Sequence, residues 1–593
     1  MALASKIRIE IEGEELNDFL HLTINQNIYT HHEFEVVCRM DTFEEKDGFV
    51  MEQSKKFIGS VISISIEAKM KGKSQASDHL FKGLITTLRT AKSHTGESDH
   101  VILAGYSPDI LLSDNPGSFS YENKTLKQIA DDLLKPYPKD LLKVRTDPAK
   151  NDRLTYIVQY NETRYNFLRR IAARFGEWLF YDGTQLVFGK LPDNRIDLKL
   201  GLDLNDFNFS IRMNPLKFKY VGYDYSSGDA VETVSDKFGG KDNLNNYGGF
   251  AHNASMKEFG QQSTLLYNHL NVPGNNYKKE LENVVGLEEG ASALSMSLMQ
   301  GSSQNPQLKP GSKVNIKALK IGQDGEVDYG EYIITSVSHS CDNTMNYQNN
   351  FEGIPAEAKI PDYTNPHAIP LCESQSAVVK DNNDPDKLGR VRVKFFWQED
   401  NVMSPWLRLV NVYSGEDRGF YFIPEIDDEV LVGFEGGNAE KPYVIGSMYH
   451  GKNKPSWNDQ DNSFKGILTR SKLKIEFDDK KKIVTIETPA GNRAVLSDDG
   501  KSIILHDQNQ NKIELTSSGI SMDSMKDIKI TSKAKVTIEG TAGVDISSTS
   551  DAKVSGLNID LNAKVGLTAK GNATAELSAA GQTTVKGAMV MIN

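Results

Sequence analysis

Alternating apolar and polar positions run through most of the chain, as expected for β-strands that bury one face. In "DPDKLGRVRVKFFW", residues 384–397, valine and phenylalanine alternate with arginine and lysine after a turn sequence and a glycine. Similar short runs fill the first hundred residues, each bounded by Gly, Asn, Asp or Lys clusters. The pattern predicts a mainly β protein.

Two segments instead carry apolar residues at helical spacing. Residues 125–136 begin at a Thr125 cap and end at a proline, and residues 161–176 end at Gly176. We expect a helix in each. The Gly- and Asn-rich stretch at residues 235–250 predicts an exposed loop.

The last quarter of the chain changes character, because no aromatic residue follows Phe477 and Gly, Ser, Thr, Ala, Lys and Asp dominate. Such a composition is often disordered. Here, however, apolar residues recur every eight positions with one step of seven, and a disordered chain has no reason to keep a register. The repeat positions are Ile530, Ile538, Ile546, Val554, Leu561, Ala569, Leu577 and Val585. Most have a second apolar residue two positions earlier, so each octad is expected to form a short strand and a polar turn.

Two small apolar side chains per octad cannot enclose a core. The face they form must be buried against neighbours, either successive coils of one chain or the same coil of partner chains, and the period alone leaves both open. The lack of aromatic side chains fits the narrow axis of a β-helix in either case.

Composition narrows the class of protein further. A chain of 593 residues predicts about three to five domains. The net charge of −12 argues against nucleic-acid binding, which needs a basic surface. Cys38, Cys341 and Cys372 lie far apart, which predicts synthesis in a reducing cytoplasm. We expect no signal peptide and no membrane span, because no apolar run is long enough for either.

Three groups of residues superficially resemble reactive or metal sites. The His-His-Glu sequence at residues 31–33 lacks the helical spacing of a zinc protease. The acidic loop at 381–386 contains a proline and places Arg392 where a calcium loop needs a bidentate glutamate. The carboxylates at 427–429 are better explained as a solvated turn. We therefore expect no catalytic residue, no metal and no cofactor.

Five stretches resemble the VgrG family, the valine–glycine repeat spikes of type VI secretion, and the fused hub-and-spike proteins of phage tails. The first is "QYNETRYNFLRRIAARFGEWLFYDG". In order, the stretches are the hub motif at 159–183, the closing strands of the hub at 330–355, a small oligonucleotide/oligosaccharide-binding (OB) type barrel at 381–397 and 404–451, and the sheet leading into the spike at 491–522. One departure is Ile426-Asp427, where the family usually has a glycine before Asp-Glu-Val.

The resemblance implies a mainly β, multidomain fold. Its expected parts are a tandem β-barrel hub with a few helices at 1–370, an OB-fold barrel at 371–455, a connecting β region at 456–520, and a trimeric, triple-stranded β-helix spike at 521–593. It also implies a structural function, that of the central spike of a contractile injection system, which stands on the inner tube and pierces the target envelope.

The same resemblance implies partners and a location. The partners would be two further copies in a homotrimer, an inner-tube protein, baseplate proteins, a PAAR-type tip cap and secreted effectors. Nucleic acid is not among them, and the target membrane is met only by piercing. Assembly would occur in the cytoplasm, followed by export through the contractile apparatus.

Two sets of residues carry these expectations. The spike core is expected at Ile530, Ile538, Ile546, Val554, Leu561 and Leu577. The seat for the tip cap is expected at Val585, Met589, Met591, Ile592 and Asn593. The alternative for the tip is that its methionines merely close the core.

Other readings of the whole chain stay open. The machine could be an extracellular injection particle or a phage tail rather than type VI secretion, and the spike could carry an intrinsic envelope-hydrolase activity. A trimeric adhesin or tail fibre is a third reading, but fibres need no hub, and the stretches at 159–183 and 330–355 resemble one.

Ile538→Asp tests the register of the octads. In a threefold assembly it would bury three carboxylates near one axis, and each costs several kcal/mol without a partner. Lys535→Asp is the matched control and should change stability by no more than about 0.5 kcal/mol per site, as ordinary surface changes do. Thermal unfolding followed by circular dichroism measures both variants, and equal losses would show the register to be wrong.

Overall fold

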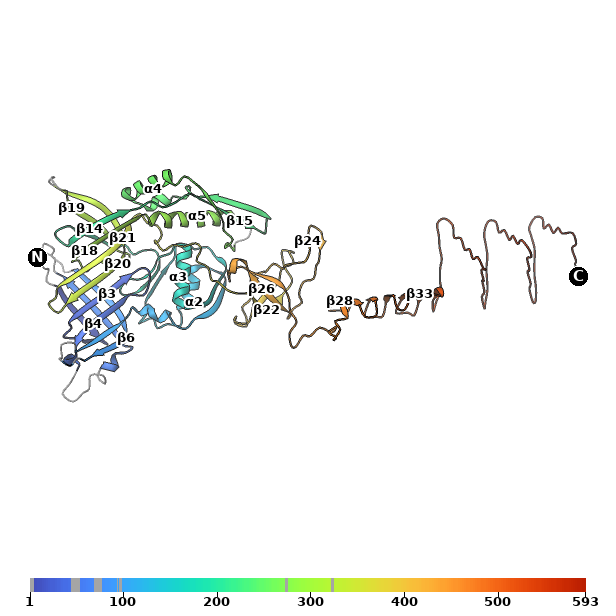
Figure 1. The fold of residues 1–593 in the computed structure, drawn as a ribbon, viewed down its shortest axis with the longest axis horizontal. Helices are drawn as coiled ribbons and strands as arrows, with labels where there is room; N and C mark the ends of the chain where they lie inside the picture. Colours follow the sequence, from blue (N-terminus) through green and yellow to red (C-terminus); the bar gives the residue numbers. More distant parts are fainter. Residues whose placement is uncertain are drawn as a thin grey trace. The chain divides into compact units, whose positions relative to one another are not determined.

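The computed structural model describes residues 5–43, 54–68, 77–92, 94, 99–271, 276–320 and 325–592. The chain divides into two compact units, Met1–Lys454 and Pro455–Asn593. Strands are the main regular elements of both, and the described helices all belong to the first (Figure 1). The expected mainly β, multidomain fold is confirmed. No helix among the described residues is long and apolar enough to cross a membrane.

A thirteen-stranded sheet is the framework of the first unit. Its N-terminal strands are β1 (Ser5–Ile11), β2 (Glu14–Glu15), β3 (His21–Asn27), β4 (Glu33–Arg39), β5 (Val61–Ala68), β6 (Ser77–Ala91) and β7 (His100–Tyr106). Its later strands are β13 (Arg195–Lys199), β14 (Leu204–Ile211), β18 (Ser297–Ser303), β19 (Lys313–Leu319), β20 (Glu326–Asp342) and β21 (Tyr347–Pro355). The two groups join where β20 pairs antiparallel with β3. The early strands bury one apolar cluster, which includes Ile24 and Ile64, and the later strands bury another, which includes Ile316 and Ile334.

The structure confirms both predicted helices, α2 (Leu126–Leu134) and α3 (Arg164–Phe175). The Thr125 side chain accepts from the backbone N–H of Gln128 at 3.2 Å, and the Gln128 side chain accepts from the backbone N–H of Thr125 at 3.0 Å. Helix α3 ends at Gly176, whose φ of 69° is the left-handed conformation that favours glycine. The neighbouring strands are β8 (Gly117–Lys124), β9 (Val144–Asp147), β10 (Leu154–Glu162), β11 (Leu179–Tyr181) and β12 (Leu186–Gly189).

The expectation of an exposed loop at residues 235–250 is wrong. The segment contains the short helix η4 (Gly240–Asn243) and the start of α4 (Asn246–Glu258), and Gly240 is buried. A Cβ atom at Gly240 would lie 3.0 Å from the side chain of Glu289 on helix α5, so the glycine permits close packing. The sequence analysis missed α5 altogether. The elements in this region are α5 (Tyr277–Leu294), β15 (Phe218–Asp224), β16 (Asp229–Val234) and β17 (Ser263–Leu266).

The stretch at residues 384–397 leads into a small barrel, as the sequence predicts. Val393 and Phe395 on strand β23 are buried, and the strands are ordered β23-β22-β26-β27. Asp427 has a φ of 68°, which explains why a glycine suits the turn before β26. The strands are β22 (Gln375–Asp381), β23 (Arg392–Phe395), β24 (Ser414–Gly415), β25 (Arg418–Gly419), β26 (Glu429–Phe434) and β27 (Pro442–Ser447).

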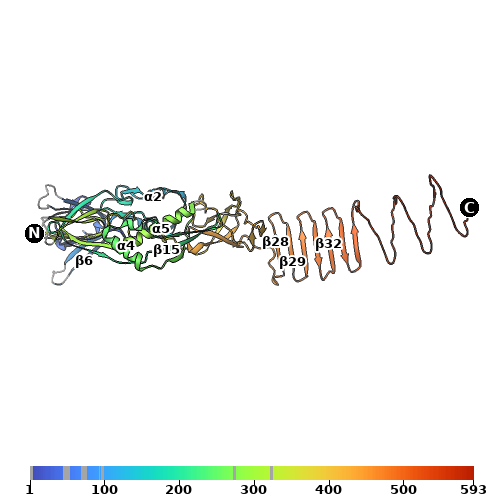
Figure 2. The same cartoon turned by 90° about the horizontal axis from the view of Figure 1, so that it is seen from above.

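The second unit begins with seven consecutive strands that form an antiparallel meander (Figure 2). These are β28 (Phe464–Leu468), β29 (Lys474–Asp478), β30 (Ile483–Glu487), β31 (Arg493–Ser497), β32 (Ser502–His506), β33 (Lys512–Thr516) and β34 (Gly519–Asp523). Beyond β34, residues 524–592 form no strand within one chain. The backbone bends at 525–526, 533–534, 541–542, 549–550, 557, 564–565, 572–573, 580–581 and 588–589. The bends thus follow the octad period, including its single seven-residue step.

Candidate functional site

One face of the β28–β34 sheet is the first candidate for a functional surface. In these five-residue strands the second and fourth residues point to this face, and the pairing stacks them in two columns. The first column is Ile467, Ile475, Ile486, Ala494, Leu505, Ile513 and Met522, and the second is Lys465, Phe477, Val484, Leu496, Ile503, Leu515 and Ile520. Every member except Lys465 is apolar. We call these two columns the apolar face.

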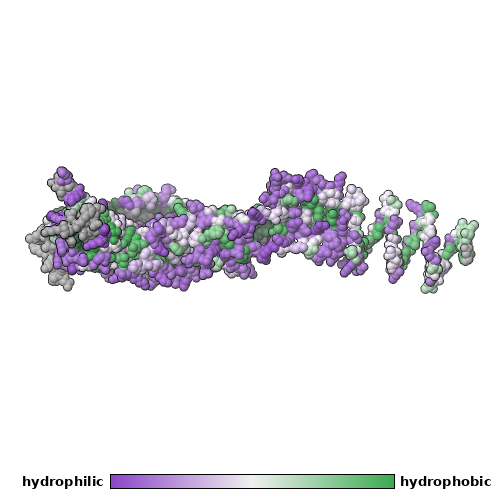
Figure 3. Space-filling view, turned by 90° about the horizontal axis from the view of Figure 1, so that it is seen from below, coloured by the Kyte–Doolittle hydropathy of each residue, from purple (hydrophilic) through white to green (hydrophobic). Residues whose placement is uncertain are grey.

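No described residue of the second unit covers the apolar face. Leu505 is 46% exposed and Ile486 is 50% exposed. Complete burial of such a side chain contributes about 1.5–3 kcal/mol, so each half-exposed one forgoes roughly half of that. The opposite face is largely polar and carries cross-strand ion pairs such as Lys474 with Glu487 at 2.8 Å. Figure 3 shows apolar side chains on this sheet bordered by hydrophilic ones. The sheet is therefore two-sided, with an apolar side that lacks a core in a single chain.

The expected spike and tip residues are also exposed in the single chain. Those of the spike core are Ile530, Ile538, Ile546, Val554, Leu561 and Leu577, and those of the tip are Val585, Met589, Met591 and Ile592. Asn593 lies outside the described residues. No strand pairing links successive coils within residues 524–592. One chain does not bring these side chains together, so their roles stay predictions.

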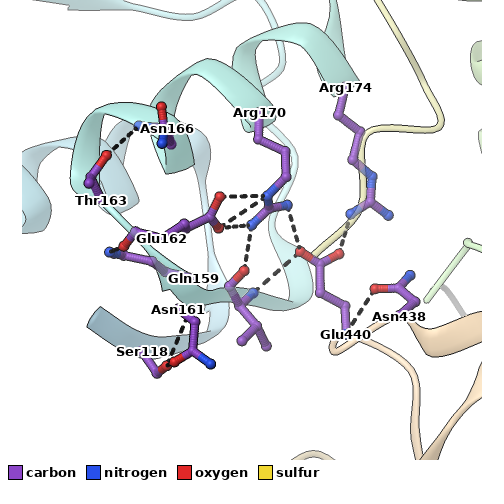
Figure 4. A network of polar contacts seen from close by, with 11 residues as sticks. Ser118, Gln159, Asn161, Glu162, Thr163, Asn166, Arg170, Arg174, Asn438 and Glu440 are labelled. Carbon is purple, nitrogen blue, oxygen red and sulfur yellow. Dashed lines mark hydrogen bonds and ion pairs between the residues drawn. The ribbon is translucent and has the colours of Figure 1, made fainter. Parts of the chain in front are cut away.

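A buried ion network connects helix α3 to the small barrel (Figure 4). Glu440, in the turn between β26 and β27, is fully buried. Its carboxylate accepts from Arg174 Nη1, from Arg170 Nη1 at 3.5 Å and from the backbone N–H of Val158 at 3.3 Å. Because Arg170 and Arg174 lie one turn apart on α3, the helix holds the barrel's carboxylate with two cations.

The arginines of this network have further partners. Arg170 Nη2 lies 2.7 Å from a carboxylate oxygen of Glu162, and Arg174 Nη2 donates to the carbonyl of His269 at 3.0 Å. Burial lowers the pKa of Arg174, but the charges of Glu440 and Tyr267 and their hydrogen bonds together outweigh it and raise that pKa above its usual value. Burial and the charge of Arg174 lower the pKa of His269 to about 4, which keeps the imidazole neutral beside the cation. Every buried charge in the network is therefore compensated.

Additional contacts close the same junction. The backbone N–H of Ala439 donates to the carbonyl of Pro370 at 2.9 Å, and the amide of Gln398 donates to the Ser120 hydroxyl at 2.8 Å. Tyr156 is buried in an apolar cluster with Ala439. The small barrel is thus held against β8, β10 and α3 by charge, backbone and apolar contacts together.

This network was not predicted from the sequence. A usable signal was present, because Arg170 and Arg174 stand four residues apart on the predicted helix and so share a face. Their partner Glu440 is 266 residues further along the chain from Arg174, and nothing local marks it as buried.

The groups considered as reactive sites have structural partners instead. His31 Nδ1 lies 2.7 Å from a carboxylate oxygen of Asp109. In the acidic loop, Arg390 pairs with Asp384 at 2.6 Å. Hydrogen bonds from Arg390 hold the pKa of the Asp384 carboxyl well below its usual range. In the part of the chain that the structure describes, no group of three or more His, Cys, Asp or Glu side chains could hold a metal ion.

Glu440→Gln tests the energetic weight of the junction. The change preserves the side chain's size but leaves Arg174, whose side chain is 8% exposed, without a counter-charge. Breaking one partner of a buried pair costs about 3–5 kcal/mol. Glu435→Gln, which loses a more exposed pair with Lys441, should cost at most about 1 kcal/mol. Differential scanning calorimetry measures the melting temperature of both variants. Equal decreases in melting temperature would show that the network contributes no more to stability than an exposed ion pair.

Parts of the chain are similar in sequence to described proteins. The type VI secretion system spike protein VgrG5 of Pseudomonas aeruginosa is 29% identical over 198 residues, which cover 28% of this chain and 24% of that protein. The spike protein VgrG3 of Vibrio cholerae is 22% identical over 398 residues, which cover 60% and 37%. The chain thus spans well under half of these relatives' lengths.

Solved structures resemble it in fold. In the half-lidded PdpA–VgrG complex of Francisella, one chain is 10% identical with a TM-score of 0.56, over 88% of each chain. At that identity the likeness concerns the fold alone.

Two family models match the chain, and their limits follow the structure. Residues 375–449 match the type VI secretion system/phage-baseplate injector OB domain, which coincides with β22 to β27. Residues 27–345 match the phage tail baseplate hub model, from the end of β3 to just past β20. The hub match alone covers more than half of the 593 residues. The chain therefore belongs to the phage tail baseplate hub family.

Proposed function

We propose that this chain is the structural spike of a contractile injection system of the type VI secretion class. The observation that carries the proposal is the apolar face, whose two in-register columns run across all seven strands without a cover from the described residues of the same unit. Three copies around a common axis would bury these columns against one another. A homotrimer thus supplies the missing core, and the curated relatives that match this chain are named as spike proteins.

The octad region follows the same logic. Of the two ways to bury its face, pairing between successive coils of one chain is not found in residues 524–592. Pairing between partner chains remains, and it gives a triple-stranded β-helix with Ile530, Ile538 and Ile546 at its axis. Residues 521–593 would then form the needle and 456–520 its base.

The first unit would anchor the needle. We assign residues 1–370 to the hub, which would sit on the inner tube and contact baseplate proteins, and 371–455 to the barrel between hub and needle. The junction at Glu440 would transmit the push from hub to barrel, because charge, backbone and apolar contacts all cross it. Effectors would travel on the spike, which would assemble in the cytoplasm and leave through the apparatus.

The proposed role is mechanical and needs no catalysis. A spike that also hydrolyses envelope polymers is the alternative, and an assay of the pure protein on peptidoglycan decides between them. A phage tail or an extracellular injection particle is a second alternative, since the hub family takes its name from phage tails. Neighbouring genes for a membrane complex would indicate type VI secretion.

Leu505→Asp tests whether the apolar face is the trimer interface. In a free chain the site is half-exposed and the change should be tolerated, whereas in a trimer it buries three unpaired carboxylates. Ser521→Asp, on the opposite face, is the control. Multi-angle light scattering should give three times the 65.9 kDa of one chain for wild type and control, and a smaller mass for Leu505→Asp. A stable, folded wild-type monomer would refute the trimer.

Deleting residues 587–593 tests the tip. The octads below are complete without it, so the trimer should remain folded, yet it should lose the apolar seat formed by Met589, Met591 and Ile592. We expect the truncated spike to fail to retain a PAAR-type cap in a pull-down in which the full chain succeeds. Unchanged cap affinity would mean that the cap docks elsewhere.

A further inference from the structure

Three imidazoles lie buried together inside the large sheet of the first unit. His32 precedes β4, His79 lies on β6 and His339 lies on β20, and their exposed fractions are 0%, 3% and 1%. The ring centroids of His79 and His339 are 4.4 Å apart. Strands from both groups of the sheet therefore meet at one cluster of titratable side chains.

A directional chain of hydrogen bonds fixes the protonation of two of the rings. Asn349 Nδ2 donates to the Tyr347 hydroxyl at 2.8 Å, and that hydroxyl lies 2.6 Å from His339 Nδ1, to which it donates when the ring is neutral and carries its proton on Nε2. His339 Nε2 then donates to Gln26 Oε1 at 3.0 Å, and Gln26 Nε2 donates to His32 Nδ1 at 3.2 Å. His339 and His32 both accept at Nδ1, so both must be neutral.

The chain ends at a backbone carbonyl. His32 Nε2 donates to the carbonyl of Asn27 at 3.1 Å. Reversing the Gln26 amide would require His32 to donate from both nitrogens and so to carry a charge, which its complete burial opposes. The carbonyl therefore fixes the direction of the chain for a neutral His32. A proton added to Nδ1 of either ring removes an acceptor and breaks the chain.

The third ring, that of His79, has a nitrogen without a hydrogen-bond partner in the described part of the chain. His79 Nε2 is buried and has no hydrogen-bond partner among the described residues. Burial lowers the pKa of His79 to about 3 and that of His32 to about 4, and burial also holds the pKa of His339 well below its usual value. The titratable or charged groups around the cluster are Asp109, Asp182, His31 and Tyr181 near His32, Lys309 near His79, and Tyr347 beside His339.

We propose that His32, His79 and His339 form an acid-sensitive latch that holds β3 and β20 together at neutral pH and releases them in acid. The place is critical, because the pairing of β3 with β20 joins the two strand groups of the sheet. Gln26 on β3 and His339 on β20 cross that seam through their hydrogen bond. Protonation would put like charges a ring's width apart in a dry interior and would break the bridge.

The direction of the pH dependence follows from linkage. A histidine in the opened state takes up its proton near pH 6.5, whereas these rings resist it in the closed state. The opened state therefore binds more protons between about pH 6.5 and pH 4. The stability of the closed state relative to the opened state decreases as pH falls through that window. Each ring involved multiplies the opening constant by about ten per pH unit. The latch is thus closed above about pH 6.5.

Hydrogen–deuterium exchange of the full chain between pH 7 and pH 5 measures this opening. After correction for intrinsic exchange, protection of β3 and β20 amides should fall by about a hundredfold or more from pH 6 to pH 5, because at least two rings take up protons. Strand β26 of the small barrel is the internal reference and should change less than tenfold.

Two variants assign the effect. His79→Gln removes one titrating ring, so the loss of β3 and β20 protection per pH unit should be about tenfold smaller than in the wild type. His21 is an exposed histidine on β3, and His21→Gln should leave this pH dependence unchanged. A wild-type loss of less than tenfold in β3 and β20, or a slope that His79→Gln does not alter, would overturn the proposal. Should His79→Gln fail to fold, the wild-type slopes of β20 and β26 still decide, because equal slopes exclude the latch.

Discussion

The structure of the second unit depends on one constraint: an apolar strand face that the described residues of the unit leave uncovered. Each strand of the meander contributes two inward residues, and the antiparallel register aligns them without a break from Ile475 to Met522. A sheet of this kind supplies only one side of a hydrophobic core. Covering that side is favourable, because burial of apolar surface is the dominant favourable term in folding. The octads continue the constraint with smaller side chains and a fixed period of bends. The proposed association with identical faces would satisfy both regions at once, since identical chains place identical residues at the same height.

The first unit differs, because it buries its own cores within one chain. Its sheet holds separate apolar clusters, and its small barrel is fixed to α3 by a carboxylate that two arginines share. A flexible connection there would dissipate an axial push as bending. Removing one partner of a buried ion pair leaves an uncompensated charge, so the Glu440 network would resist separation of the barrel from α3 under the proposed load.

Local patterns in the sequence predicted the parts of the fold that local physics determines. The Thr125 capping box, the Gly176 stop and the alternation in β23 all depend on neighbours within a few residues, and all are found. The prediction of a loop at residues 235–250 was wrong. Glycine and asparagine usually indicate a loop, but here Gly240 permits the close approach of helix α5, which is distant in sequence. Glu440 was invisible for a related reason, since burial of a carboxylate is decided by partners far away in sequence.

The candidate surfaces divide in the same way. The eight-residue period was evident in the sequence and matches the spacing of the backbone bends. Ile538 is nevertheless exposed in one chain, so the period alone does not identify what covers the apolar face of the octads. The two columns of the apolar face needed the strand register, which short runs separated by variable turns do not specify. The histidine cluster needed the tertiary pairing of β3 with β20, which no local pattern contains.

The central claim is that identical chains bury the apolar face against one another. Electron cryo-microscopy of the purified full-length chain tests it most directly. The account predicts three copies with the columns that contain Leu505 and Ile503 turned toward a common axis and the face that contains Lys474 and Glu487 in solvent. A particle in which those columns face solvent, or in which a single chain folds back to cover them, would contradict it.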